Sequence, residues 1–150
     1  PLETSVPNKH SVIQDYVLHK IKPYADVSFE TLFMLDSGNL TDTHRAQMVA
    51  AILATPATKI IICHGTNTMT ETADYLSFHL KTTNKKIVLT GSMIPLKEFA
   101  MSDAGFNLGY AIAEVSHLTA GVYICMNART FKAGTVVKNF ELGRFEPKDS

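Results

Sequence analysis

The sequence lacks the features that mark membrane proteins and nucleic-acid-binding proteins. Its longest apolar runs are far too short to cross a bilayer, and no signal peptide is visible. Fourteen basic side chains balance fourteen acidic ones, so no excess of one charge would attract nucleic acid or an anionic membrane. We therefore expect neither nucleic acid nor a membrane as a partner.

Cysteine is scarce, and this limits both disulfide and metal chemistry. Cys63 and Cys125 are the only two cysteines, too few for a disulfide framework, and both lie in predicted buried strands. Buried, reduced thiols favour an intracellular, cytoplasmic location. A metal site at Cys63 and His64 is disfavoured, because adjacent strand residues point to opposite faces and no second ligand pair has suitable spacing.

The chain also has no internal repeat, no low-complexity tract and no composition shift that would mark a domain boundary. Its 150 residues are 45% hydrophobic and 19% charged, which suits an ordered domain with a real core. Residues 1–150 are therefore expected to form one domain.

Hydrophobic periodicity predicts strands that alternate with helices along the chain. Such alternation implies right-handed βαβ units, and hence an α/β fold with three layers and a mostly parallel, Rossmann-like sheet. The predicted strands cover 27–33, 59–63, 86–90, 122–126 and 135–139, and the predicted helices cover 10–21, 42–54, 69–80 and 102–115.

Two local features are also predicted. In the helix over 102–115, Phe106 and Ala111 are expected to face inward. The polar tail from Glu141 is expected to be mobile.

The stretch 59–73 organises the rest of the chain. Its first half is apolar and β-branched, as in a strand buried on both faces, and Gly65 ends it. Helical spacing begins at Met69, and Thr68 with Glu71 matches a capping box. A strand that meets a helix in this way favours binding of a carboxylate, phosphate or oxyanion, and a hydroxyl there could act on a bound carbonyl. The alternative is an ordinary turn without a site, and nucleotide binding is disfavoured because no P-loop lysine or Rossmann glycine set is present.

Four loops rich in polar groups should emerge at the same edge of the parallel sheet, namely 36–39, 65–67, 90–92 and 127–138. Each alone resembles a turn or cap, but pockets are built from polar groups on several segments. A pairing of Thr66 with Lys138 would be sensible chemistry, since a neutral lysine can accept a hydroxyl proton. Spacing does not pair them, and Lys138 could equally be a solvated surface lysine.

Four ordered segments carry a resemblance to a known family. The run His-Gly-Thr-Asn-Thr-Met-Thr-Glu-Thr-Ala at 64–73 closely resembles the signature of the bacterial-type L-asparaginases, amidohydrolases that also include glutaminases. The closest likeness is to compact homologues that hold only the amino-terminal asparaginase domain, and it covers nearly the whole chain. The other matching segments are Asp-Ser-Gly-Asn-Leu-Thr at 36–41, Thr-Gly-Ser-Met-Ile-Pro at 90–95 with Ser-Asp-Ala-Gly-Phe-Asn-Leu at 102–108, and Met126-Asn127 followed by Lys138.

The chain departs from this family in two places. The family's first threonine, usually assigned as the nucleophile, lies after a first strand that has no counterpart here. We therefore expect an additional amino-terminal segment of roughly 15–30 residues, about a strand and a loop. Second, Asn67 replaces an aspartate that anchors the substrate's α-ammonium in the family. Activity toward L-asparagine should therefore be reduced or altered, and an amide without a free α-amino group is a candidate substrate.

The resemblance implies an amidohydrolase that converts a side-chain amide, such as that of L-asparagine, to the acid and ammonia through a threonine nucleophile. Thr66, Lys138 and Asn67 would be catalytic, and no metal or organic cofactor would be needed. The alternative is a catalytically impaired domain that binds a small amino acid or amide. The resemblance also implies a homo-oligomer, a dimer or tetramer. The residues expected to bind substrate are Ser37, Gly38, Gly65, Thr66, Asn67 and Ser92.

Overall fold

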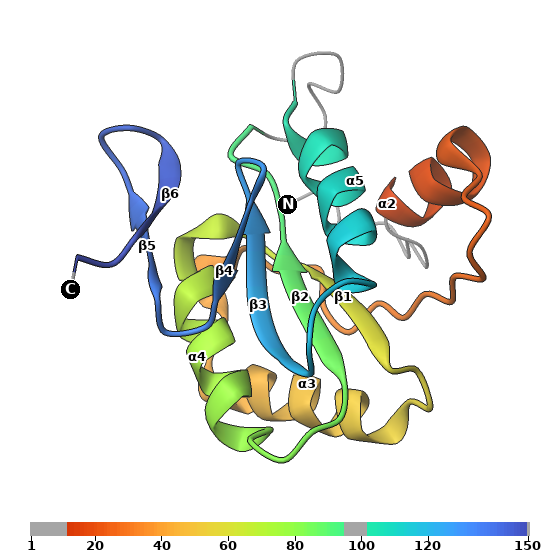
Figure 1. Ribbon diagram of the computed structural model, residues 1–150, viewed down its shortest axis with the longest axis horizontal. Helices are drawn as coiled ribbons and strands as arrows, with labels where there is room; N and C mark the ends of the chain where they lie inside the picture. Colours follow the sequence, from red (N-terminus) through yellow and green to blue (C-terminus); the bar gives the residue numbers. More distant parts are fainter. Residues whose placement is uncertain (1–11, 95–101, 150) are drawn as a thin grey trace. The chain divides into compact units, whose positions relative to one another are not determined.

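The computed structural model describes residues 12–94 and 102–149 (Figure 1). The chain divides into two compact units, 1–35 and 36–150. Every residue of the predicted site belongs to the second unit.

The described residues of the first unit, 12–35, contain one short helix. It begins as α2 (Val12–Asp15) and continues as η1 (Tyr16–Ile21), whose turns are of the wider π type. The helix ends because Lys22 adopts the left-handed conformation, with φ of 51°, and donates its N–H to the Val17 carbonyl oxygen at 2.9 Å. The helix predicted over 10–21 is thus confirmed from Val12 onward, and residues 10 and 11 lie outside the described part of the chain.

The strand predicted over 27–33 is wrong. This segment pairs with no strand among the described residues, and the side chains of Val27 and Thr31 are exposed. Alternation of apolar and polar residues is a local signal, whereas a strand also needs a neighbour to pair with its backbone N–H and C=O groups. Without such a partner the segment has irregular backbone.

The second unit follows the predicted order of strands and helices and confirms the mostly parallel α/β fold. Its main sheet has the order β1-β2-β3-β4, with β1, β2 and β3 parallel and β4 antiparallel to β3, while β5 and β6 form a separate antiparallel hairpin. The elements are η2 (Ser37–Asn39), α3 (Asp42–Ala54), β1 (Lys59–Cys63), η3 (Thr66–Thr68), α4 (Met69–His79), β2 (Lys86–Thr90), α5 (Ala104–Val115), β3 (Gly121–Met126), β4 (Arg129–Lys132), β5 (Val136–Asn139) and β6 (Arg144–Pro147).

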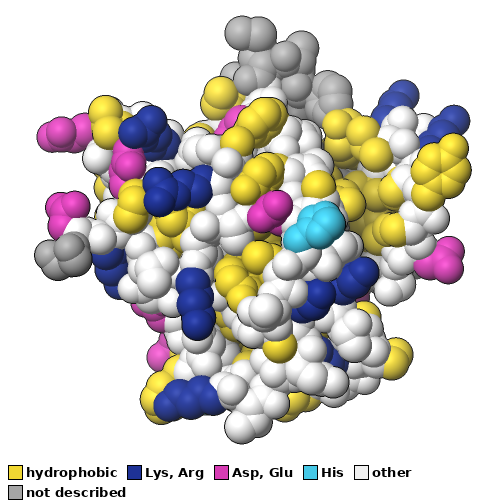
Figure 2. Space-filling view, in the orientation of Figure 1, with side chains coloured by type: hydrophobic (Ala, Val, Ile, Leu, Met, Phe, Trp, Pro, Cys, Tyr) yellow, Lys and Arg dark blue, Asp and Glu magenta, His cyan; other side chains and the backbone are white. Residues whose placement is uncertain are grey.

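Charges of both signs are distributed over the surface. Figure 2 shows Lys and Arg side chains interspersed with Asp and Glu over the face in view, as the balanced composition predicts. In the described ranges, every helix is too short or too polar to span a bilayer.

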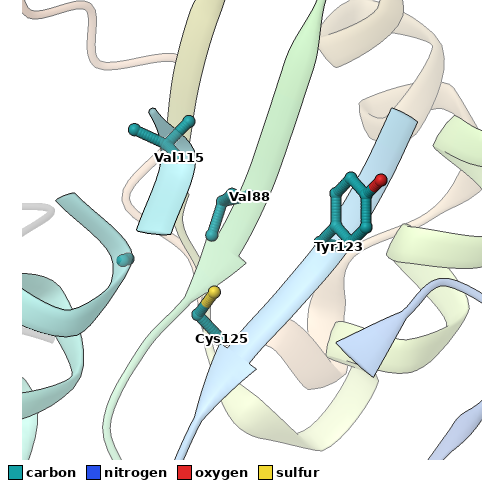
Figure 3. Close-up of a cluster of buried hydrophobic side chains, with 5 residues drawn as sticks. Val88, Val115, Tyr123 and Cys125 are labelled. Carbon is teal, nitrogen blue, oxygen red and sulfur yellow. The ribbon is translucent and has the colours of Figure 1, made fainter. Parts of the chain in front are cut away.

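The core lies on both faces of the main sheet. Helix α5 covers one face, and α4, with α3 packed against it, covers the other (Figure 1). On the α5 face, Val88 of β2 and Tyr123 and Cys125 of β3 pack with Ala111 and Val115 (Figure 3). Because strand side chains alternate, the neighbouring residues point to the other face and are fully buried. These are Ile87, Leu89, Ile124 and Met126.

Strand β1 is less buried than its apolar sequence predicts. It forms one edge of the sheet described here, its three isoleucines are only partly buried, and Cys63 is exposed. The run of isoleucines predicted burial on both faces, but within the described ranges β1 pairs with β2 alone and is not enclosed as a central strand is. Cys125 lies in central β3 and is buried as predicted, and both cysteines are free.

Strands β4 and β6 were not predicted from the sequence. Asn127 and Ala128, with φ of 57° and 55°, join β3 to β4 in a two-residue turn whose positive φ values match type I′. The expectation of a mobile tail from Glu141 is wrong, because β6 pairs with β5 and Phe145 is only 3% exposed. Both strands have four residues, too few to display alternation, and Asn-Ala lacks the glycine that usually marks such a turn.

Candidate functional site

Thr66 and Lys138, 72 residues apart in sequence, are in direct contact. Thr66 begins η3 just beyond the carboxyl end of β1, and Lys138 lies in β5. The Lys138 Nζ is 2.8 Å from the Thr66 Oγ1 and 2.9 Å from the Asn67 Oδ1, within hydrogen-bond distance of both. It also lies 4.8 Å from the centre of the Phe140 ring. The predicted pairing of hydroxyl and amine is therefore present in the fold.

Partial burial makes the Lys138 ammonium easier to deprotonate than that of a fully solvated lysine. Desolvation by burial lowers the pKa of its ammonium. The two oxygens that contact Nζ are uncharged, and within the described part of the chain no carboxylate forms an ion pair with it. A lysine in such a setting loses its proton more readily and can then accept one from a hydroxyl.

Ser37 lies beside the Thr66 turn in a buried position. The Asp36 carboxylate accepts the Gly38 N–H at 3.0 Å and so holds η2, which places Ser37 at 1% exposure. A Cβ added to Gly65 would lie 2.7 Å from the Ser37 Oγ, so the two loops are in close contact. Among the described residues, the Ser37 Oγ has no hydrogen-bond partner. A buried hydroxyl without a partner is costly, and a bound ligand could satisfy it.

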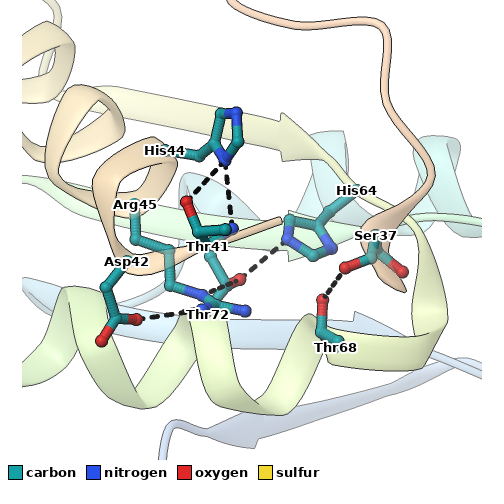
Figure 4. A network of polar contacts seen from close by, with 8 residues as sticks. All are labelled: Ser37, Thr41, Asp42, His44, Arg45, His64, Thr68 and Thr72. Atoms are coloured by element: carbon teal, nitrogen blue, oxygen red, sulfur yellow. Dashed lines mark hydrogen bonds and ion pairs between the residues drawn. The ribbon is translucent and has the colours of Figure 1, made fainter. Parts of the chain in front are cut away.

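The predicted capping box at Thr68 and Glu71 is not formed. The Thr68 side chain makes no cap hydrogen bond, and its Oγ1 donates instead to the Ser37 carbonyl oxygen at 2.7 Å (Figure 4). Because residues 66–68 form a 3-10 turn, Thr68 has φ of −123° and ψ of 22° and lacks the extended backbone usual for a capping residue. Its hydroxyl thereby fixes the Ser37 loop against the start of α4.

Gly91 brings the loop after β2 against the same turn. The His64 N–H donates to the Thr90 carbonyl oxygen at 2.9 Å, and a Cβ on Gly91 would lie 2.1 Å from the His64 carbonyl oxygen. Only glycine fits so close to another backbone. Ser92 follows in a partly buried position, and residues 95–101 of the predicted loop and helix start lie outside the described chain. The loop that contains Ser37 thus packs against Gly65, and the loop that contains Gly91 and Ser92 packs against the neighbouring residue, His64.

A polar network that was not predicted from the sequence joins His64 of this turn to α3 and α4 (Figure 4). His64 is buried, with its Nε2 2.9 Å from the Thr72 Oγ1 and its Nδ1 2.6 Å from the Gly65 carbonyl oxygen. The Arg45 Nε donates to the Thr72 Oγ1 at 3.0 Å. The only signal in the sequence is that Arg45 and Thr72 occupy helix positions next to apolar core residues.

This network assigns the protons of His64. A carbonyl oxygen can only accept, so Nδ1 carries the proton toward Gly65. Arg45 can only donate, so the Thr72 hydroxyl is free to donate to Nε2 of a neutral ring. Burial is the main cause of a lowered pKa for His64; Arg45 lowers it further, while the bond to Gly65 and the charge of Glu71 oppose the shift.

Metal ligands do not gather at this site. No group of three His, Cys, Asp or Glu residues in the described ranges is arranged to hold a metal ion.

The predicted site residues come together in two groups. Direct contacts join Thr66, Asn67 and Lys138, and close packing joins Gly65 to Ser37. Gly38 lies in η2 together with Ser37, and Ser92 directly follows Gly91 in the chain.

Comparison with known proteins identifies the family. Residues 4–144 match the family described as "Asparaginase, N-terminal". A glutaminase-asparaginase of Acinetobacter glutaminasificans is 32% identical over 130 residues, which cover 82% of this chain and 39% of that protein. A probable cytoplasmic L-asparaginase from Campylobacter jejuni has a structure with a TM-score of 0.73 and 32% identity, over 82% of this chain and 42% of that one.

A second solved structure agrees. The thermostable L-asparaginase from Thermococcus kodakarensis has a TM-score of 0.79 and 26% identity, over 90% of this chain and 42% of that one. Both structural neighbours are thus more than twice as long as the region they share with this chain. From the fold, the ordered loops and these matches together, the chain belongs to the asparaginase family and corresponds to its amino-terminal domain.

Proposed function

We propose that this domain carries the threonine–lysine site of an amidohydrolase that hydrolyses a side-chain amide such as that of L-asparagine. The contact of 2.8 Å between the Lys138 Nζ and the Thr66 Oγ1 is the observation that supports it. The neutral lysine accepts the hydroxyl proton of Thr66, and the Thr66 oxygen then attacks the amide carbon. Thr66 is the hydroxyl that this chain supplies for the attack.

The remaining steps follow from ordinary acyl transfer. Attack places negative charge on the amide oxygen, and backbone N–H groups near Thr66 at the start of α4 stabilise it. Lys138 returns the proton to the leaving nitrogen, ammonia departs, and an ester links the acyl group to Thr66. Water, deprotonated by the same amine, then cleaves the ester, which releases the acid and regenerates the hydroxyl.

The serine loops and Asn67 shape the preference for substrate. The unpaired Ser37 Oγ and the hydroxyl of Ser92 donate hydrogen bonds to the substrate carboxylate. Asn67 supplies an oxygen but no charge, so a substrate ammonium gains less here than it would beside a carboxylate. We therefore expect succinamate, which is L-asparagine without its α-ammonium group, to be used in preference to L-asparagine.

Ammonia release by the purified protein tests this function, with L-asparagine, L-glutamine and succinamate as substrates. Thr66→Val and Lys138→Met should each lower kcat by at least about 100-fold, the usual size of a lost general base or nucleophile. Lys148→Met, at an exposed lysine, should leave turnover unchanged. Equal turnover in Lys138→Met and the unaltered protein would refute the proposal.

A second candidate function is ligand binding without turnover, as in a sensor or regulatory domain. The uncharged Asn67 in place of the family's aspartate and the unpaired Ser37 hydroxyl favour it. L-Aspartate should then raise the Tm in a concentration-dependent way while no amide releases ammonia. We also propose a homo-oligomer, by resemblance to the family, and a cytoplasmic location, which the free cysteines and the description of one structural neighbour as cytoplasmic support.

A further inference from the structure

Asn107 is a buried residue in the first turn of α5, and Lys138 lies in a different element, β5. It is 1% exposed, and its Nδ2 donates to the Gly91 carbonyl oxygen at 2.8 Å and to the Asp103 Oδ2 at 2.9 Å. Its Oδ1 accepts the Asn127 N–H at 3.3 Å. The amide thus has all its donors and its acceptor engaged, and the loop after β2 and the turn after β3 are joined through it.

Asn127 continues the connection to the hairpin that carries Lys138. Its Oδ1 accepts the Phe145 N–H of β6 at 3.0 Å. Phe145 lies opposite Lys138 in the register of β5 and β6. A series of hydrogen bonds therefore runs from the Gly91 loop through Asn107 and Asn127 to the residue that faces Lys138.

The hairpin needs such a connection because it is not part of the main sheet. Among the strands that the structure describes, β5 and β6 pair only with each other. Buried Val136 and Phe145 attach the hairpin to the rest of the unit, but burial of apolar surface has no preferred direction. A hydrogen bond does have one, and the bond from Phe145 to Asn127 fixes where along the sheet edge the hairpin lies.

We propose that Asn107 and Asn127 are positioning residues that hold the Lys138 amine against the Thr66 hydroxyl. The proposal rests on the proposed function insofar as it concerns turnover. Asp103 extends the same connection to the Ser92 loop, since its carboxylate accepts the N–H groups of Met93 and Ile94, each at 3.0 Å. One polar network thereby places both the base and a substrate-binding loop.

The residue types fit this role. Asn107 must donate on one side and accept on the other, which an amide does and a carboxylate does not. Asn127 must adopt φ of 57° and also offer an oxygen, and asparagine is among the few residues suited to both. Aspartate at 127 would keep the left-handed backbone and the acceptor, whereas glycine would keep only the backbone.

The test compares Asn127→Gly with Asn127→Asp and with Ala128→Gly. Ala128 also has positive φ, so glycine there introduces the same backbone freedom without loss of a side-chain acceptor. We expect Asn127→Gly to lower kcat for amide hydrolysis about tenfold or more, as a small misplacement of a base does, with KM nearly unchanged. Asn127→Asp and Ala128→Gly should retain kcat within about twofold.

A second measurement does not depend on activity. The lysine Cε–H signals, labelled with carbon-13 and assigned with Lys138→Met, give the titration of Lys138 by NMR. In the unaltered protein the pKa should lie below that of a solvated lysine, and Asn127→Gly should return it toward the ordinary value as Nζ enters water.

The two measurements separate the two proposals. A protein without amidase activity whose Lys138 titration shifts only in Asn127→Gly would refute the proposed function and support the positioning role. An unchanged Lys138 titration and kcat in Asn127→Gly would overturn the positioning role. Equal losses in Asn127→Gly and Asn127→Asp would also overturn it, because the second variant keeps the acceptor.

Discussion

At position 67, asparagine stands where the asparaginase signature has aspartate, and the structure places its oxygen 2.9 Å from the Lys138 amine. A carboxylate there would favour the ammonium form of Lys138, whereas the amide leaves desolvation as the cause that determines the direction of its pKa shift. One side chain therefore affects both the charge of the base and the charge offered to the substrate.

We predict that Asn67→Asp reverses the order of substrates. The new carboxylate should attract a substrate ammonium and raise kcat/KM for L-asparagine relative to succinamate by about tenfold, the effect of roughly 1.4 kcal/mol. It should also raise the pKa of Lys138 and move the pH–rate profile to more alkaline values. Steady-state kinetics with both substrates check this, with Asn84→Asp, at an exposed position in the loop before β2, as the control for added charge. An unchanged ratio would contradict it.

We predict that the free energy of unfolding decreases in mild acid because of His64. Its pKa is lower in the folded protein than in the unfolded chain, so the unfolded chain binds the proton first as pH falls. Stability should therefore decrease as pH falls below about 6.5, the ordinary histidine value, until the folded pKa is reached. His64→Asn keeps a donor for the Gly65 carbonyl but does not titrate. The drop in Tm between pH 7 and pH 5 should be smaller in this variant, and equal drops would exclude His64 as a source.

At the scale of elements, the strong local patterns predicted the structure well. Strands β1, β2 and β3 and helices α3, α4 and α5 occur where apolar spacing indicated, and the strand-to-helix loops meet at one edge because parallel strands require it.

At position 106 the periodicity of apolar residues gave the wrong prediction of burial. Phe106 was expected inside but is 62% exposed, and Asn107 is buried instead. The hydrogen bonds of Asn107 join segments distant in sequence, so they decide which side of the first helical turn faces inward, and no local pattern reports them.

Lys85 gives an element-scale prediction for helix α3. Its Nζ donates to the carbonyl oxygens of Ile52 and Thr55 in the last turn of α3, where a positive charge also complements the helix dipole. Lys85→Met should lower the unfolding free energy by about 1–2 kcal/mol and the Tm by roughly 3–8 °C. Thermal unfolding followed by circular dichroism measures this. Lys86→Met should shift the Tm less, since that amine makes only an exposed contact of 3.3 Å with the Ser116 carbonyl oxygen. Equal shifts would count against the capping role.

At the scale of the whole molecule, the hydroxyl and the base depend on different sheets for their positions. Thr66 lies in η3, just beyond the carboxyl end of β1 in the four-stranded sheet, and Lys138 lies in β5 of the separate hairpin. The sequence could not reveal this separation. It predicted a strand over 135–139 correctly, but strand propensity does not say which sheet a strand joins.

We predict that the hairpin opens before the main sheet. A two-stranded hairpin is marginally stable by itself, whereas β2 and β3 are paired on both sides and buried. Native-state hydrogen exchange should therefore find a lower opening free energy for amides of β5 and β6 than for amides of β2 and β3. Phe145→Ala should widen the difference by removing a buried anchor. A single opening free energy for both sheets would contradict the prediction.

The close approaches at Gly65 and Gly91 bear on how this site could be redesigned. A side chain at Gly91 would collide with main-chain oxygen, and one at Gly65 would collide with Ser37. Substitution of either glycine would therefore displace one of the loops that build the site. A library of variants intended to change substrate choice should keep both glycines constant. It should vary Asn67 and Ser92, the residues proposed here to contact the substrate.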